Sequence, residues 1–139
     1  MRAVADNNIV ISGLLWRGPS RDLLDAAREG KLELFTSGAL LAELEDVLQR
    51  TKFVKRLAEA QLQPRDLVNG FAALATVVQP GPITPVVIRD PDDDAVVACA
   101  VAAAATSIIS GDGHLLELKK YREIEIIKVA DFITQLGKG

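Results

Sequence analysis

The residues best able to do chemistry in this chain are carboxylates at the ends of predicted strands and the starts of predicted helices. Asp6 comes directly after the apolar residues 3–5, and Asp112 follows the predicted strand 107–110, which has two isoleucines at its centre. Asp94 lies near the start of a long apolar helix. The carboxyl ends of parallel strands and the N-termini of the helices that follow them meet at one edge of a sheet. We therefore expect these three acids to lie close together.

A fourth acid is expected from a helix predicted over residues 37–48. Ser37 is a suitable N-cap, and the apolar residues that follow recur with the helical period of 3.6. Glu43 lies at one border of the apolar face and Glu45 at the other, whereas Asp46 points further towards solvent. The periodicity alone leaves Glu43 and Glu45 as equal candidates.

Several of the acids also have a structural explanation. Asp112 precedes a predicted short helix and is typical of an N-cap. A structural role is favoured for the acids around Pro91, whose charges suit the N-terminus of a helix: Asp90, Asp92 and Asp93. Asp6 is harder to explain in this way, because a carboxylate next to a buried strand needs a cation or hydrogen-bond donors.

A cluster of three or four carboxylates favours a hard cation. Gathering anions is costly unless a cation neutralises them, and oxygen ligands favour Mg²⁺ or Mn²⁺ over zinc. Such ions can activate water and stabilise charge on a phosphodiester. Other chemistries have little support, because His114 is the only histidine, Cys99 lies in an apolar run, and no glycine-rich nucleotide-binding loop is present.

The elements that must position these acids alternate between strands and helices. Strands are predicted at 3–5, 32–36, 86–88, 107–110 and 125–129, and helices after the turn at 6–8, at about 19–29, 37–48 and 52–60, from 64, and at 92–105, 115–119 and 131–136. This alternation predicts a three-layer α/β/α fold with a central, mostly parallel sheet. Residues 1–139 are expected to form a single domain.

The composition limits the class of protein. The chain is 49% hydrophobic and contains one cysteine, so we expect an aliphatic core, a buried thiol and a reducing, cytoplasmic environment. The first apolar run is interrupted at Asp6, which argues against a signal peptide or membrane span.

The distribution of charge gives mixed information about nucleic acid. The net charge of −3 provides no overall field that would attract a polyanion. A basic cluster within residues 50–56 is most simply a solvated helix face. The hypothetical RNA-backbone contacts are Arg17, Arg21, Lys52, Lys55 and Arg56, and binding through them should weaken as salt rises.

Four segments, 4–12, 37–44, 89–94 and 109–112, resemble in that order the acidic motifs of PIN-domain proteins. The likeness spans nearly the whole chain and is closest to VapC-like ribonucleases, the toxin components of toxin-antitoxin pairs. It implies a metal site and chooses Glu43 over Glu45, the site acids being Asp6, Glu43, Asp94 and Asp112. Asn8 and Ser110 would support the acids. Asn7 stands where the family usually has threonine, which leaves the acids intact but changes the hydrogen bonding around them.

The resemblance also implies RNA cleavage, dependence on Mg²⁺ or Mn²⁺, a homodimer and an antitoxin partner. One alternative is a catalytically silent PIN domain that only binds RNA or an antitoxin. A receiver-like, phosphate-accepting signalling domain is less favoured. That class needs an acidic pair at the first strand and a lysine directly after the last one, whereas Lys128 is embedded in the last predicted strand.

Overall fold

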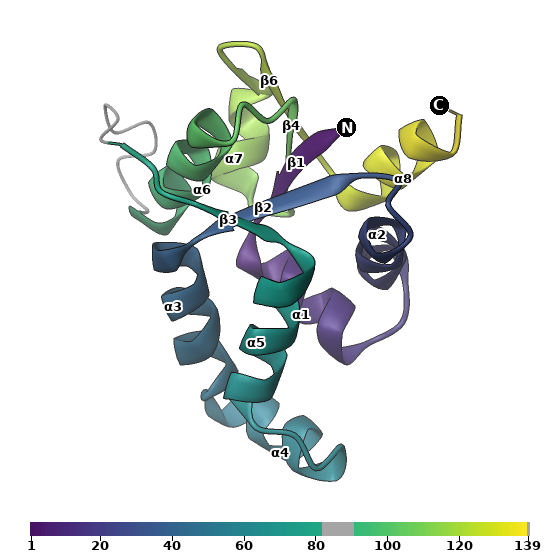
Figure 1. Cartoon of the computed structure of the whole chain (residues 1–139), viewed down its shortest axis with the longest axis vertical. Coiled ribbons are helices and arrows are strands. Elements are labelled where there is room, and N and C mark those ends of the chain that lie inside the picture. Colours follow the sequence, from purple (N-terminus) through teal and green to yellow (C-terminus); the bar gives the residue numbers. More distant parts are fainter. Residues whose placement is uncertain (82–90, 139) are drawn as a thin grey trace.

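The computed structural model describes residues 1–81 and 91–138, which contain a six-stranded sheet (Figure 1). Its strands are β1 (Arg2–Ala5), β2 (Glu33–Ser37), β3 (Thr76–Val78), β4 (Ser107–Ile109), β5 (Lys120–Tyr121) and β6 (Ile124–Ile127). They are arranged in the order β3-β2-β1-β4-β6-β5. Every neighbouring pair is parallel except β5 and β6. The predicted α/β fold with a mostly parallel sheet is confirmed.

Helices cover both faces of the sheet. They are α1 (Asn7–Leu15), α2 (Pro19–Arg28), α3 (Gly38–Leu48), α4 (Thr51–Glu59), α5 (Pro64–Leu74), α6 (Pro91–Ala102), α7 (Gly113–Leu118) and α8 (Val129–Lys138). Alternate strand residues point to opposite faces. In β1, Ala3 and Ala5 join one hydrophobic cluster with helices α1 to α5 and α8, while Val4 joins another with α6 and α7. Each cluster fills the interface between the sheet and the helices on one of its faces.

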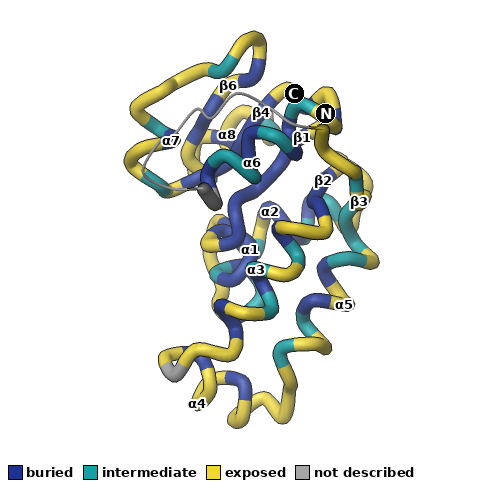
Figure 2. The backbone as a smooth tube through the Cα atoms, turned by 90° about the vertical axis from the view of Figure 1, so that its left-hand side faces the viewer, coloured by how far each residue is buried: buried dark blue, intermediate teal, exposed yellow. Residues whose placement is uncertain are grey.

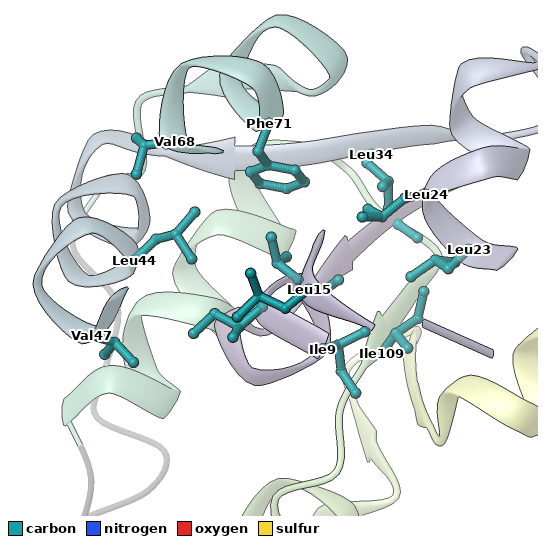
Figure 3. Close-up of a cluster of buried hydrophobic side chains, with 14 of the residues drawn as sticks. Ile9, Leu15, Leu23, Leu24, Leu34, Leu44, Val47, Val68, Phe71 and Ile109 are labelled. Carbon is teal, nitrogen blue, oxygen red and sulfur yellow. The ribbon is translucent and has the colours of Figure 1, made fainter. Parts of the chain in front are cut away.

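The larger cluster fixes the position of α1, whose first turn carries the candidate site. Figure 3 shows Leu15 of α1 among side chains from neighbouring elements, including Leu24 of α2 and Phe71 of α5. Gly13 allows the close approach of α2, because a Cβ atom there would lie 2.6 Å from the backbone oxygen of Ser20. Burial thus holds α1 rigidly under the sheet, whereas the α4 end of the molecule is largely exposed (Figure 2).

Most of the predicted elements are present, and the differences have simple causes. The strand at 107–110, the helix at 37–48 and the last strand and helix are all found within two residues of their expected bounds. β3 was not predicted, because it is a three-residue edge strand with two exposed residues. The strand predicted at 86–88 lies outside the described residues. Among the described residues, no helix combines the length and apolarity needed to cross a membrane.

Candidate active site

A small cleft at the carboxyl edge of the sheet brings together acids from four separate segments. Its volume is about 130 Å³, and its lining residues are Asp6, Asn7, Asn8, Glu43, Val47, Arg50, Asp93, Val96 and Asp112. Three of the four predicted acids, Asp6, Glu43 and Asp112, are therefore placed together. A larger groove of about 770 Å³ between α2 and α8 contains none of the predicted site residues.

Asp6 lies at the centre of the cleft's polar network. It follows β1 directly and caps α1, with Oδ1 accepting a hydrogen bond from the backbone N–H of Ile9 at 3.1 Å. Its Oδ2 accepts a hydrogen bond from the hydroxyl of Ser110. The side chain is buried at 6% exposure. The same residue thus ends a strand, starts a helix and presents a carboxylate at the sheet edge.

Burial makes ionisation of Asp6 unfavourable. Desolvation is the main cause that raises the pKa of its carboxyl above the ordinary value of 3.8, and the nearby Asp112 raises it further. Hydrogen bonds from Ser110, Ile9 and Asn8 lower the pKa but do not cancel the effect of burial. A cation in the cleft would favour the charged form, so the electrostatics of Asp6 suit cation binding.

Ser110 and Asp112 extend this network from β4 into α7. The Ser110 hydroxyl, which is fully buried, donates to Asp6 and accepts from the backbone N–H of Asp112 at 2.9 Å. Asp112 caps α7 through Oδ1, which accepts hydrogen bonds from the N–H groups of His114 and Leu115 at 2.8 and 3.1 Å. The capping explanation for Asp112 is therefore correct, and the same residue also lines the cleft.

The geometry separates Glu43 from Glu45. Glu43 lines the cleft, and its Oε1 accepts a hydrogen bond from Nδ2 of Asn7 at 2.7 Å. Asn7 also donates to the carbonyl of Leu40 at 2.8 Å, so its amide links the first turn of α1 to α3. Glu45 instead lies 3.8 Å from Arg65 of α5. Asn7, expected only to replace the family's usual threonine, positions Glu43 through this hydrogen bond. Asn8, expected to support the acids, lines the cleft as an exposed residue.

Asp93 takes the place in the cleft that was expected for Asp94. Asp93 is buried at 5% exposure and lines the cleft, whereas Asp94 is half-buried and is not among the lining residues. Successive residues of a helix are rotated by about 100° around its axis, so the side chains of Asp93 and Asp94 leave α6 in different directions. Asp93 could have been identified from the sequence, because it lies three and seven residues before the buried Val96 and Ala100 and so shares their face of the helix.

Arg50 brings a positive charge to this acidic cleft. It is the cation among the described lining residues, and it lies at the junction of α3 and α4. Its guanidinium is 3.9 Å from Asp46, but both side chains are more than half exposed, so this ion pair constrains it weakly. A phosphate group entering the cleft would meet Arg50 beside the carboxylates.

The predicted RNA contacts divide into two groups. Arg21 donates to the carbonyls of Gly13 and Leu14, and Arg56 donates to that of Leu15 through both Nε and Nη2. These two arginines therefore cap the C-terminus of α1, where cations interact favourably with the helix dipole. The remaining candidates are exposed: Arg17, Lys52 and Lys55.

The donor set suits Mg²⁺ or Mn²⁺, because the cleft offers carboxylate and amide oxygens without sulfur or histidine. Within residues 1–81 and 91–138, no three acidic, histidine or cysteine side chains converge closely enough to coordinate one ion together. Mg²⁺ commonly uses one or two carboxylates and keeps several waters. The cleft fits that mode of binding better than a closed cage.

The single cysteine offers no competing chemistry. Cys99 is fully buried in α6, and desolvation raises the pKa of its thiol to about 12. The thiol therefore stays protonated and is not an activated nucleophile. Its position confirms the prediction of a buried, free thiol.

Comparison with known proteins shows which family the chain belongs to. A family model described as PIN domain matches residues 2–114. The chain belongs to the PIN domain family. The matched part of this PIN domain contains all the acids of the cleft. No curated protein sequence matches the chain.

The architecture of this PIN domain is similar to a solved structure of VapBC2 from Rickettsia felis bound to a DNA fragment from their promoter. The similarity covers 91% of this chain and 97% of that chain, with a TM-score of 0.59 and 13% sequence identity. At that identity the likeness shows the fold alone. The family expected from the acidic motifs and the three-layer fold expected from the alternation of strands and helices are both confirmed.

Proposed function

We propose that this PIN domain is a metal-dependent endoribonuclease whose ion lies among Asp6, Glu43, Asp93 and Asp112, coordinated directly by one or two of these carboxylates and through water by the others. The observation that carries the proposal is the convergence of acids from four segments on one cleft around the buried Asp6. The family membership supports nuclease chemistry. We propose Asp93 rather than Asp94 as the acid contributed by α6, because Asp93 lines the cleft.

The residues of the cleft would have separate roles. Bound Mg²⁺ or Mn²⁺ would supply activation of water and stabilisation of charge on the phosphodiester. Ser110 and the N–H of Ile9 fix the two oxygens of Asp6, and Asn7 holds Glu43. Such fixed carboxylates need little reorganisation when they bind a cation.

The direct test is cleavage of RNA with Mn²⁺ and with EDTA. Asp6→Asn should abolish Mn²⁺-dependent cleavage while the circular-dichroism spectrum stays native. Glu45→Gln, an acid on the same helix as Glu43 but beside Arg65, is the matched control and should retain activity. Undiminished cleavage by Asp6→Asn would contradict the proposal. Mn²⁺ binding without cleavage by the wild-type protein would instead support a catalytically silent PIN domain.

We further propose that the chain is the toxin of a toxin-antitoxin pair and acts on RNA in the cytoplasm as a homodimer. The resemblance to VapC-like proteins supports the partner, and the buried free thiol supports a reducing environment. Light scattering after size exclusion should give twice the chain mass of 14.9 kDa. A single-chain mass across concentrations would contradict the homodimer.

A further inference from the structure

The only tryptophan of the chain, Trp16, presents its ring to solvent directly after α1. It is 44% exposed, although a large aromatic side chain normally gains from burial. One part of the ring packs against Phe53 of α4, with ring centroids 6.2 Å apart and planes inclined by 54°. Phe53 is itself buried, so the exposed ring of Trp16 rests on a fixed support.

Basic residues occur near this aromatic pair: Lys52 contacts Phe53, Arg17 follows Trp16 in the chain, and Lys55 is on α4. Arg17 and Lys55 are exposed, and Nζ of Lys52 lies 4.9 Å from the centroid of the Phe53 ring. Glu59 is the acid of the same helix, one turn beyond Lys55. This surface is locally basic although the chain carries a net charge of −3.

The aromatic pair and the acidic cleft are linked through the start of α4. The backbone N–H of Phe53 donates to the carbonyl of Arg50 at 3.0 Å, and Arg50 lines the cleft. Arg50 therefore lies about one turn of helix from Phe53, the ring that supports Trp16. Figure 2 shows how much of α4 is exposed at this end of the molecule.

We propose that Trp16 stacks against an unpaired base of single-stranded RNA whose phosphates lie along Arg50 and Lys52. The inference rests on the proposed function and specifies its substrate class. Basic grooves with an exposed aromatic ring bind single strands, because every base has a face that can stack, whereas the bases of a duplex are already stacked on each other. The surface carries exposed basic side chains and an exposed aromatic ring, and Arg50 belongs both to the start of α4 and to the acidic cleft.

Because Trp16 is the only tryptophan, the tryptophan fluorescence of the full-length protein reports on this residue alone. In EDTA, which prevents metal-dependent cleavage, a short single-stranded RNA should quench the fluorescence of Trp16 to saturation. The same strand paired with its complement should quench much less. RNA binding measured by anisotropy of a labelled strand should weaken roughly 5- to 150-fold in Trp16→Ala and be largely restored in Trp16→Phe. Val77→Ala, which alters an equally exposed side chain on β3, should bind as the wild type does.

Several results would overturn this inference. An unchanged affinity in Trp16→Ala, or binding without quenching, would assign the ring to a protein partner or to plain surface. Absence of binding in EDTA would also overturn it. Cleavage of RNA by the wild type with Mn²⁺ but without quenching would refute only the role of Trp16. Quenching without cleavage would refute the proposed nuclease instead. Thermal melting of Trp16→Ala separates lost binding from lost folding.

Discussion

Replacing Asn7 by alanine should loosen the contact that joins the start of α1 to α3. The Asn7 amide donates a buried hydrogen bond to the Leu40 carbonyl and a partly buried one to the carboxylate of Glu43. A neutral hydrogen bond contributes about 0.5–1.5 kcal/mol and one to a charged group about 1.5–3 kcal/mol. The expected loss in the free energy of unfolding is therefore about 2–4 kcal/mol. Denaturation with urea would measure it.

A double-mutant cycle shows whether Asn7 acts through Glu43. Asn7→Ala, Glu43→Ala and the double variant should show a coupling energy of about 1–3 kcal/mol, since each single variant removes the same hydrogen bond. Mn²⁺ binding should weaken in Asn7→Ala but change no further when Glu43 is already absent. Asn8→Ala, at the exposed neighbouring position, should change stability by less than about 0.5 kcal/mol. Additive effects of Asn7 and Glu43 would refute the positioning role.

Three other perturbations test separate parts of the structure. Burial raises the pKa of Asp6, so without metal the folded state binds the Asp6 proton more tightly than the unfolded state does. The protonated side chain therefore contributes stability below pH 3.8, and this contribution is lost as the pH rises through the folded pKa. Melting curves should show Asp6→Asn gaining stability over the wild type at neutral pH, with the gain narrowing in acid; a gain independent of pH would contradict this. Gly13→Ala should cost about 1–3 kcal/mol in chemical denaturation because its Cβ meets the α2 backbone, whereas Gly70→Ala, with open space in α5, should stabilise by about 0.5–1 kcal/mol. Lys52→Gln should reduce the slope of the logarithm of the single-strand RNA binding constant against the logarithm of the salt concentration by about 0.7. Arg56→Gln should mainly lower stability, because Arg56 caps α1. Equal slopes for Lys52→Gln and the wild type would exclude a phosphate contact of Lys52.

The fold could be predicted because strands and helices differ in the spacing of their apolar residues and alternate along the chain. Apolar strands such as β4 alternate with helices such as α3, and that alternation requires a parallel sheet covered on both faces. The acids after β1 and β4 could be assigned to one edge from topology alone. By contrast, the edge strand β3 is short and exposed, so it has no apolar pattern to identify it.

The details of the cleft depended on side-chain direction and tertiary contacts. Glu43 and Glu45 border the same apolar face, so the helical period could not separate them. The family resemblance favoured Glu43, and the packing of α3 against α1 and α5 places Glu43 in the cleft and Glu45 beside Arg65. Asp93 belongs to a run of acids at the start of α6, and it was assigned a structural role because acids are common at helix N-termini for electrostatic reasons. Basic residues of the α4 region looked alike in sequence, yet Arg56 turned out to cap a distant helix.

The most direct test of the cleft compares two adjacent acids in one assay. Calorimetric titration with Mn²⁺ should show that Asp93→Asn loses most of the binding seen in the wild type. Asp94→Asn removes the same charge one residue along α6 and should keep most of it, because its side chain does not line the cleft. Loss of Mn²⁺ binding in Asp94→Asn with retention in Asp93→Asn would contradict the site described here.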